Sequence, residues 1–258
     1  MSSTRLPGKI MAEIAGKPML AHVYERVSRA TLPKDVVVAT TTEVADDVVE
    51  AYCQAHAIPV FRGSPFDVLD RYYQAASKMS ADVVVRITAD CPLIDPALLD
   101  RVVSGREVQN LDFACNRLPP PWHRTFPIGL DVETCTFASL ERTWREARMA
   151  HQREHVMPYM YEEVELGPLH HDWQVGESTR GFRIGLLHHV VDCGALRWTV
   201  DTPEDLEFAR QVYARLQDRG EFGWQDVLEV VEAEPRLAQI NAGVRHNRLE
   251  DVDPRGPS

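Results

Sequence analysis

Three short segments, far apart in the chain, carry residue types suited to phosphate chemistry. Residues 2–9 combine small side chains with the cations Arg5 and Lys9, and the backbone N–H groups of such a loop bind a polyphosphate together with its cations. Asp90 and Asp201 each follow a short apolar run. Two carboxylates at strand ends hold the divalent metal ion that phosphate chemistry uses. The combination predicts nucleotidyl transfer, with these two cations and two aspartates as the catalytic residues.

The loop over residues 2–9 matches neither of the common phosphate-binding motifs. A P-loop has a glycine five residues before its Gly-Lys pair and Ser or Thr after it, but Ser3 and Ile10 occupy those places. No Gly-x-Gly-x-x-Gly follows a strand either. We therefore interpret the loop as a separate phosphate site, in which Ser2, Ser3 and Gly8 allow close approach of the backbone. The alternative is a frayed, basic N-terminus without a role.

The setting of the two aspartates favours a shared metal ion, Mg²⁺. Pro92 comes two residues after Asp90 and stops the preceding strand, which exposes the carboxylate at the rim of the sheet. Asp201 stands directly before Thr202, which is typical of a helix N-cap. Either aspartate alone is equally explained as a turn former or cap, and Asp95 is assigned only to the cap of the following helix. Two of them at predicted strand exits indicate a metal site.

Hydrophobic periodicity predicts an alternation of helices and strands in the first part of the chain. Such alternation is typical of a doubly wound α/β sheet, whose ligands bind at the carboxyl ends of the strands. The predicted helices cover Pro18–Arg29, Val44–His56 and Val68–Met79, and the predicted strands cover Asp35–Thr40, Pro59–Arg62 and Asp82–Thr88.

The pattern changes after residue 116, where a proline-rich stretch follows. We divide the chain into a nucleotidyltransferase domain, residues 1–220, and a C-terminal helical extension and tail, residues 221–258. Strands are predicted over Asp131–Cys135, Arg183–Leu187 and Leu196–Val200, and helices over Phe137–Arg148, His151–Glu163, Pro203–Leu216 and Trp224–Glu232.

Composition bounds the function. The chain has 258 residues, 44% of them hydrophobic, and a formal net charge of −11, which suits a well-packed α/β protein and argues against a nucleic-acid surface. The five cysteines show no Cys-x-x-Cys spacing, so neither a disulfide framework nor a zinc site is indicated. Nothing resembles a signal peptide or a membrane span. We expect a cytoplasmic protein without a nucleic-acid or membrane partner.

The order of these motifs, together with Gly129–Glu133 and Arg153–Tyr159, resembles a known family. From Ser2 to about Leu216 the chain is similar to the cytidylyltransferases that activate acidic sugars. These include the 3-deoxy-manno-octulosonate and acylneuraminate cytidylyltransferases, and the spore coat polysaccharide biosynthesis protein F group is the most similar. The resemblance implies a three-layer, Rossmann-like α/β nucleotidyltransferase fold of GT-A type, with a mixed, mostly parallel sheet. It also implies CTP and an acidic or modified sugar as partners, and a homodimer formed through residues 162–187.

The resemblance implies roles for residues beyond the loop. In the family, positions matching Asp90 and Asp201 hold the metal that bridges the triphosphate. Lys17 either helps to neutralise the triphosphate or is a solvated surface lysine. Arg71 either contacts the nucleoside or forms an intrahelical salt bridge with Asp67. The positions similar to the nucleoside-binding segments are Thr40, Thr41, Arg62, Gly63, Ser64 and Arg71.

Sugar selection is assigned to the second half of the chain. Asp131 and Glu133 alternate along a predicted strand, so they point to one face and suit hydrogen bonding to hydroxyl groups. The solvated face of an edge strand would show the same pattern. Arg153 and His155 open a predicted helix and are taken as substrate-binding residues, and the alternative for His155 is that it only caps a contact. The adjacent pairs among the other histidines diverge on any strand or helix, so no metal site is predicted from them.

One departure from the family concerns the first strand. Its members ordinarily begin with a hydrophobic strand ahead of the phosphate loop, whereas here the loop starts at Ser2. Loss of a central strand leaves its neighbours with unpaired backbone groups. We expect the first strand to be missing from this sequence, either because the true start lies upstream of Met1 or because the chain is a damaged version.

These observations together predict a CTP-dependent enzyme that makes a CMP-sugar for surface polysaccharide and releases pyrophosphate. A glycosyltransferase, or a nucleotidyltransferase that uses another NTP, is the second interpretation, because fold does not fix chemistry. Against the glycosyltransferase, Asp90-Cys91-Pro92 lacks the usual Asp-x-Asp. The third interpretation is a nucleotide-sugar-binding module or inactive protein on the same fold.

Overall fold

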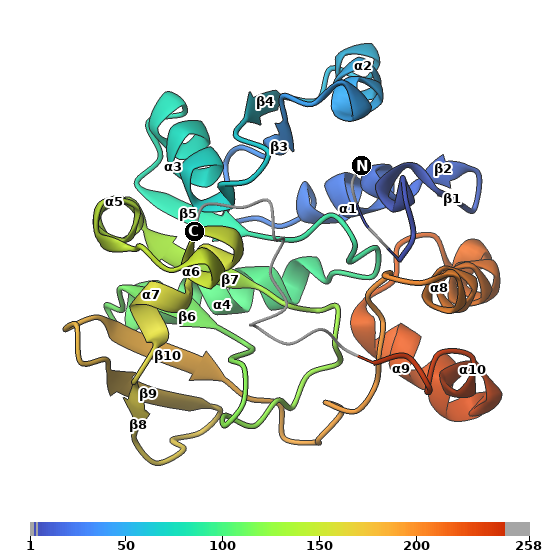
Figure 1. Ribbon diagram of the computed structural model, residues 1–258. Coiled ribbons are helices and arrows are strands. Elements are labelled where there is room, and N and C mark those ends of the chain that lie inside the picture. Colours follow the sequence, from blue (N-terminus) through green and yellow to red (C-terminus); the bar gives the residue numbers. More distant parts are fainter. Residues whose placement is uncertain (1–2, 4, 246–258) are drawn as a thin grey trace.

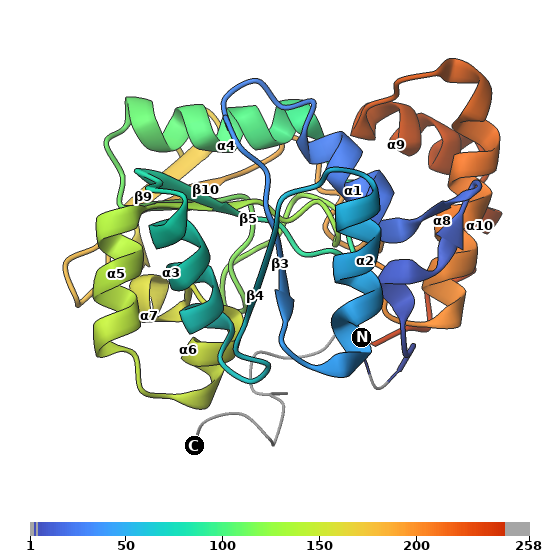
Figure 2. The same cartoon turned by 90° about the horizontal axis from the view of Figure 1, so that it is seen from above.

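The computed structural model of this chain describes residues 3 and 5–245. Its centre is a six-stranded sheet in the order β5-β7-β6-β10-β9-β8 with helices on both faces (Figures 1 and 2), which confirms the predicted three-layer α/β architecture. The strands of this sheet are β5 (Val83–Arg86), β6 (Phe113–Cys115), β7 (Glu133–Thr136), β8 (Glu165–Leu166), β9 (Trp173–Glu177) and β10 (Arg183–Leu187).

The sheet is mixed, as expected, but antiparallel neighbours outnumber parallel ones in it. Strands β6 and β10 pair in parallel, whereas β7 runs antiparallel to both β5 and β6, and β9 runs antiparallel to both β10 and β8. Antiparallel neighbours need no helical crossover. The extended connection from β6 to β7 therefore delivers β7 into the interior of the sheet, a placement that the alternating pattern of the first half did not predict.

Alternate residues of the central strands enter two separate hydrophobic cores, as the two-residue period of a strand requires. In β6, Ala114 joins the core under one helical layer, while Phe113 and Cys115 join the core under the other. All three are fully buried. The helices of the first layer are α1 (Met19–Val27), α4 (Pro96–Val108), α8 (Pro203–Leu216) and α9 (Trp224–Ala233), and those of the second are α3 (Val68–Lys78), α5 (Phe137–Glu146), α6 (Ala150–His155) and α7 (Pro158–Tyr161).

Strands β3 (Val38–Thr41) and β4 (Val60–Gly63) form a second, two-stranded parallel sheet. Figure 2 shows this sheet between α3 and α2 (Asp47–Ala55). Within residues 3 and 5–245, no strand joins β3 or β4 to the six-stranded sheet by hydrogen bonds. Between the N-terminal loop and α1, the chain forms only a 3₁₀ turn (Lys9–Met11) and the hairpin β1–β2, which pairs Glu13–Ile14 with Lys17–Pro18.

Two predicted elements are wrong. The single helix expected over 151–163 is two short helices, α6 and α7, because Val156 has a left-handed φ of 73° and Pro158 cannot donate a helical hydrogen bond. The strand expected over Leu196–Val200 is absent. Only Arg197 makes an isolated bridge, to Ile128, and the backbone that follows is bonded to loops of the site instead.

The C-terminal extension packs on the main body. Trp224 and Val227 from α9, with Leu237 from the short helix α10 (Arg236–Gln239), are buried in the same core as α1, α4 and α8. Asp95 caps α4 through the N–H of Leu98 at 2.8 Å, as predicted, and its second oxygen accepts the N–H of Trp224 at 2.8 Å. The division at residue 220 stays a prediction, but no separate core exists for residues 221–245. No helix within residues 3 and 5–245 combines the length and apolarity needed to cross a bilayer.

Candidate active site

The two predicted metal-binding aspartates, 111 positions apart in the sequence, are brought together by their backbones. The N–H of Val200 donates to the carbonyl oxygen of Asp90 at 2.8 Å, and the hydroxyl of Thr199 donates to the same oxygen at 3.2 Å. Asp201 follows directly in the chain. The loop after β5 and the segment before α8 are thus fastened side by side, which places the two carboxylates at one edge of the sheet.

A glycine lets the segment before Asp201 also pack closely against the loop at Ile128. The N–H groups of Trp198 and Thr199 both donate to the carbonyl of Ile128, at 2.7 and 3.1 Å. The next residue, Gly129, has a left-handed φ of 105°, and a Cβ built on it would lie 2.4 Å from the backbone nitrogen of Thr199. Only glycine fits both the conformation and the space. This gives a structural reason for the glycine that opens the Gly-Leu-Asp-Val-Glu motif.

The loop that carries Asp90 is also held from the helical layer behind it. Arg26 of α1 donates from Nε to the carbonyl of Ile94 at 2.6 Å, and Tyr213 of α8 donates to the carbonyl of Pro92 at 2.7 Å. Arg26 and Tyr213 are both buried. These two bonds satisfy backbone carbonyl groups of the loop and fix it at two points after the aspartate.

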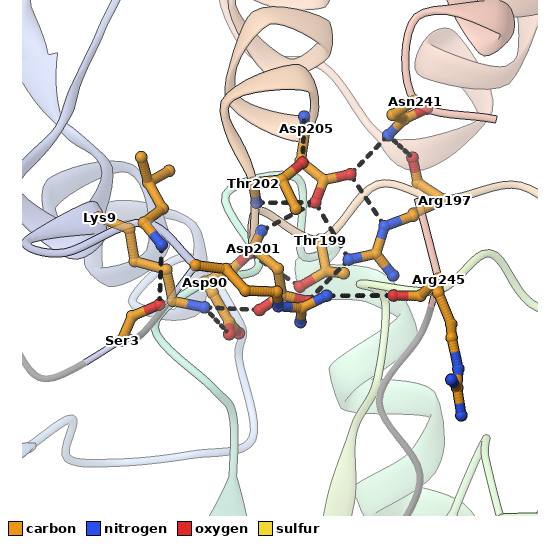
Figure 3. A network of polar contacts seen from close by, with 12 residues as sticks. Ser3, Lys9, Asp90, Arg197, Thr199, Asp201, Thr202, Asp205, Asn241 and Arg245 are labelled. Atoms are coloured by element: carbon orange, nitrogen blue, oxygen red, sulfur yellow. Dashed lines mark hydrogen bonds and ion pairs between the residues drawn. The ribbon is translucent and has the colours of Figure 1, made fainter. Parts of the chain in front are cut away.

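Lys9 lies between the two carboxylates. Its ammonium Nζ is 2.6 Å from Oδ2 of Asp90 and 2.8 Å from Oδ1 of Asp201, and Arg5 Nη2 is 3.0 Å from Oδ2 of Asp201. Figure 3 shows Lys9, Asp90 and Asp201 converging from the N-terminal loop, from the loop after β5 and from the start of α8. All four predicted catalytic residues therefore lie in one cluster, although their roles in a reaction remain predictions.

The cluster alters the ionisation of its members. Burial alone would raise the pKa of Asp201, but Lys9, with support from Arg197 and Arg5, outweighs it and lowers the pKa to about 2. Burial likewise would lower the pKa of Lys9, but Asp90 and Asp201 outweigh it and raise the pKa above its usual value. Both groups therefore stay charged across the physiological range. The positive charge of Lys9 thus neutralises part of the carboxylate pair.

The N-terminal loop has the shape of a tight turn. Gly8 has a left-handed φ of 71° at the start of the 3₁₀ turn that carries Lys9, and the N–H of Leu6 donates to the hydroxyl oxygen of Ser3 at 3.3 Å. Ser2, predicted as a nucleotide-binding residue, lies outside the described residues. Ser3 and Gly8 shape the turn that holds the two cations of the loop against the aspartates.

Behind Asp201 lies a network that the sequence analysis missed. Arg197 Nη2 donates to Oδ2 of Asp201 at 2.7 Å, and the guanidinium also pairs with Asp205 through Nε at 2.9 Å. Asp205, with no exposed surface, accepts the N–H groups of Asp201 and Thr202, each at 3.0 Å. Thr202 is the N-cap of α8, as predicted, and forms a capping box with Asp205. A buried arginine and carboxylate thus fix the orientation of Asp201.

The residues predicted to bind the nucleoside lie around the ends of β3 and β4, and those predictions remain untested. The hydroxyls of Thr40 and Thr41 donate to Oδ2 of Asp46 at 2.6 and 2.7 Å. Arg62 pairs with Asp47 and Glu50 of α2 at 2.7 and 2.6 Å. Its guanidinium therefore binds the α2 side of this small sheet.

Arg71 does not form the intrahelical pair with Asp67 that was the alternative interpretation. Its Nη1 donates to the carbonyl of Ser64 at 2.7 Å, while its Nε is buried without a hydrogen-bond partner. A Cβ on Gly63 would lie 3.0 Å from Cγ of Arg71. Gly63, Ser64 and Arg71 are therefore packed together beside the end of β4.

The residues assigned to sugar binding are engaged in ion pairs. Arg124 binds both oxygens of Asp131, at 2.5 and 3.0 Å, and Glu133, which is 4% exposed, pairs with Arg86 at 2.6 Å. Because Glu133 belongs to β7, which is paired on both sides, the alternative of a solvated edge strand is excluded.

Two further assignments concern the second helical layer and the surface. Arg153 donates from Nε and Nη2 to Oδ2 of Asp67 at 3.0 and 2.5 Å, which links α6 to the start of α3. His155 is the last residue of α6. Lys17 is half exposed and pairs with Glu25 at 2.7 Å, an arrangement typical of a surface lysine.

The donor set at Asp90 and Asp201 fits Mg²⁺, which is commonly bound by one or two carboxylates, phosphate oxygens and water. Both carboxylates reach the same point, because each lies within hydrogen-bond distance of Lys9 Nζ. No group of three or more histidine, cysteine or acidic side chains within residues 3 and 5–245 forms a complete metal cage. The pair therefore suits a metal ion that arrives with a nucleotide rather than one that is permanently enclosed.

The family model described as cytidylyltransferase matches residues 1–222. The chain belongs to the cytidylyltransferase family. It is 28% identical over 243 residues to the spore coat polysaccharide biosynthesis protein SpsF of Bacillus subtilis, covering 92% of this chain and 93% of that protein. It is 30% identical over 232 residues to the 3-deoxy-manno-octulosonate cytidylyltransferase of Solibacter usitatus, covering 82% of this chain and 90% of that protein.

A solved structure extends the likeness to three dimensions. A cytidylyltransferase from Leptospira borgpetersenii superimposes with a TM-score of 0.80 at 33% identity, and 93% of each chain is covered. The Rossmann-like nucleotidyltransferase fold and the family are thereby both established, and this cytidylyltransferase is a nucleotidyltransferase enzyme. The cluster of two aspartates with Lys9 and Arg5 lies within the residues that the family model matches.

Proposed function

We propose that this cytidylyltransferase transfers the CMP group of CTP to an acidic or modified sugar and releases pyrophosphate. The observation that carries the proposal is the cluster of Asp90, Asp201, Lys9 and Arg5, with Lys9 Nζ at 2.6 and 2.8 Å from the two carboxylates. Paired carboxylates with adjacent cations are suited to a metal-bound triphosphate. The names of the relatives support a sugar acid as the acceptor and surface polysaccharide as the destination.

In the proposed reaction, a sugar oxygen attacks the α-phosphorus of CTP, and the bond from that phosphorus to the β-phosphate oxygen breaks. Asp90 and Asp201 would hold Mg²⁺, which when bound reduces the charge on the phosphates and orients them. Lys9 and Arg5 neutralise the triphosphate and the departing pyrophosphate. Catalysis rests on positioning and electrostatics, since the site needs no covalent intermediate.

Selectivity is proposed to come from two sides of the sheet edge. The strand ends of β3 and β4, with Thr40, Thr41 and Arg71, contact the nucleoside. Asp131 and Glu133 contact the sugar, with their arginine partners setting their orientation. Arg153 and His155 are proposed as further contacts to the substrate.

We also propose a homodimer and a cytoplasmic location. Strand β8 is the edge of the six-stranded sheet, and the loop between β8 and β9 carries Leu169, which is 54% exposed. This region lies within the 162–187 segment. All five cysteines are free and buried, which suits a reducing compartment. Light scattering of the purified chain measures the mass, and a monomer at micromolar concentration contradicts the dimer.

The proposed function is tested by pyrophosphate release. The purified chain is assayed with each of the four NTPs and Mg²⁺ against a panel of acidic sugars that includes 3-deoxy-manno-octulosonate. Neutral hexoses serve as controls. We expect release with CTP and an acidic sugar, and a loss of at least about 100-fold in Asp201→Asn. Lys78→Met, at an exposed position on α3, should retain the rate of the wild type. Release that is independent of the sugar, or faster with another NTP, would refute the proposal.

A further inference from the structure

The turn after α10 reaches the active site at two points, although it lies beyond the residues 1–222 that the family model matches. Leu237 of α10 is 2% exposed and anchors this part of the chain in the main core. Residues 241–245 then run towards the start of α8, and Figure 3 shows Asn241 and Arg245 there. Asn241 contacts the network behind Asp201, and Arg245 contacts Arg5.

Asn241 makes the first of these contacts. Its side chain is buried, with 2% of the residue exposed. Its Nδ2 donates to Oδ1 of Asp205 and to the carbonyl oxygen of Arg197, both at 2.9 Å. The amide nitrogen has two hydrogens, and both are used on the two residues that orient Asp201. An amide so placed fixes the distance between the backbone of Arg197 and the carboxylate of Asp205.

From Asp205 the effect continues to the metal-binding aspartate. Besides the bond from Nε, Arg197 donates from Nη2 to Oδ2 of Asp205 at 3.0 Å. The same Nη2 also donates to Oδ2 of Asp201 at 2.7 Å. These are charge-assisted bonds within a buried cluster, where hydrogen bonds are strong and geometrically demanding. A shift of Asp205 therefore moves Arg197 and changes the direction in which the Asp201 carboxylate points.

The second contact reaches the opposite side of Asp201. The carbonyl oxygen of Arg245 accepts a hydrogen bond from Arg5 Nη1 at 3.1 Å, while Arg5 Nη2 pairs with Oδ2 of Asp201 at 3.0 Å. One short turn thus touches both arginines that bind the same carboxylate oxygen. Its removal would loosen Asp201 from both directions.

We infer that Asn241 is a positioning residue of the transferase site, through which the C-terminal extension sets the orientation of Asp201. The extension is on this basis a part of the active site rather than an appended tail. The inference rests on the proposed function for its kinetic consequences. The alignment of Asp201 for a metal-bound nucleotide is tested independently of the reaction, by measuring the affinity for CTP with Mg²⁺.

The experiment uses the full chain and three variants. Asn241→Leu keeps the side-chain size and removes both amide donors. Asn241→Ser replaces them with a single hydroxyl donor. Gln239→Leu is the matched control at an exposed position two residues earlier. Pyrophosphate release is measured against Mg²⁺ concentration, and binding of CTP with Mg²⁺ is measured by calorimetry. Melting temperatures record whether each variant is folded. Where the leucine variant does not fold, the serine variant decides.

For Asn241→Leu we expect kcat to fall about tenfold and the half-saturating Mg²⁺ concentration to rise about fivefold, while KM for the sugar changes less than twofold. Affinity for CTP with Mg²⁺ should fall about fivefold, and Asn241→Ser should lie between this variant and the wild type. A merely structural role would reduce the active fraction without changing the Mg²⁺ dependence, and that result overturns the inference.

Binding separates the two proposals. A wild type that binds CTP with Mg²⁺ but releases no pyrophosphate with any sugar refutes the proposed function alone, and the variants are then compared by affinity. Equal affinities in wild type and Asn241→Leu overturn the positioning role alone. A wild type that does not bind CTP with Mg²⁺ overturns both.

Discussion

Replacing Lys9 by methionine removes the cation between Asp90 and Asp201 and keeps most of the side-chain volume. The carboxylates cannot simply separate, because the backbone bond from the N–H of Val200 to the carbonyl of Asp90 keeps their loops together at 2.8 Å. Of the two carboxylates, Arg5 and Arg197 bind only that of Asp201, through Oδ2, so Asp90 has no other cation in the cluster. The variant therefore holds one more uncompensated negative charge in a half-buried place.

The magnitude follows from the geometry. Opposite charges about 4 Å apart attract by about 4 kcal/mol at an effective dielectric constant of about 20, and Lys9 contacts two carboxylates with side-chain exposures of 14%, 23% and 17% for Lys9, Asp90 and Asp201. Desolvation of Lys9 offsets part of this attraction. We expect Lys9→Met to lose about 3 kcal/mol of unfolding free energy at pH 7, or about 6–12 °C in Tm.

The loss should depend on pH in a defined direction. The pKa of Asp201 is lowered to about 2 in the folded protein, below its unfolded value of about 4. Its contribution is thus fully present above about pH 4 and disappears as pH falls through the folded pKa. The pKa of Lys9 is raised, so its contribution is fully present below about pH 10. The difference between wild type and variant should be constant from pH 5 to 9 and smaller at pH 3.

Urea unfolding between pH 3 and 9 measures this difference. Lys17→Met is the control, because Lys17 and Glu25 are 52% and 51% exposed and form only a surface pair, which contributes less than about 1 kcal/mol. Added Mg²⁺, without nucleotide, should raise the Tm of Lys9→Met more than that of the wild type, since it can replace the missing cation. Equal stabilities of wild type and Lys9→Met at pH 7, or an undiminished difference at pH 3, would refute the reasoning.

Two further substitutions test the scaffold of the site by urea unfolding. Gly129→Ala should lose about 3 kcal/mol of unfolding free energy, because its Cβ would meet the backbone of Thr199 at 2.4 Å. Gly16 also has a left-handed φ but nothing within 4 Å of its Cβ position, so Gly16→Ala should lose only about 1 kcal/mol. Equal losses in the two variants would exclude the steric argument. Arg86→Met should lose about 3–4 kcal/mol of unfolding free energy, because it leaves the buried Glu133 carboxylate unpaired. Adding Glu133→Gln to this variant should recover part of the lost free energy. If the losses of the two single variants simply add in the double variant, the two side chains do not interact.

Local sequence signals predicted the first half of the fold well. The helices α1, α2 and α3 and the strand β5 lie within the ranges that periodicity indicated, and β3 and β4 each end one residue beyond theirs, at Thr41 and Gly63. Each is a continuous run with its own apolar face, so neighbours in sequence determine it. The caps Asp95 and Thr202 were predictable for the same reason, because a cap bonds to residues two or three positions away.

The second half shows where local signals fail. The segment Leu196–Val200 is apolar and β-branched, yet its N–H groups bond to loops at Ile128 and Asp90 rather than to a strand. Strand β9 is defined by its pairing with β10 and β8, which the sequence does not reveal. Val156 breaks a helical pattern by adopting a left-handed φ, a conformation that its residue type disfavours. Tertiary contacts decide each of these cases.

The same distinction applies to the site. Arg5, Lys9, Asp90 and Asp201 could be identified because their types announce phosphate and metal chemistry, and the structure places them together. Asn241 could not be identified, since a lone asparagine after a helix resembles an ordinary turn residue. Its significance arises from a buried contact with Asp205, a residue that lies 36 positions earlier in the chain.

The backbone contacts around Asp90 imply that the position of this residue is fixed independently of the charge that its carboxylate carries. The position of Asp90 is set by its own carbonyl, which Val200 and Thr199 bind, and by Arg26 and Tyr213, which hold the carbonyls farther along the loop. None of these bonds uses the carboxylate. That carboxylate is therefore free to exchange Lys9 for a metal ion without releasing the loop. Asp201 differs, because Arg197 and Arg5 grip the carboxylate itself, so its alignment depends on the residues behind it.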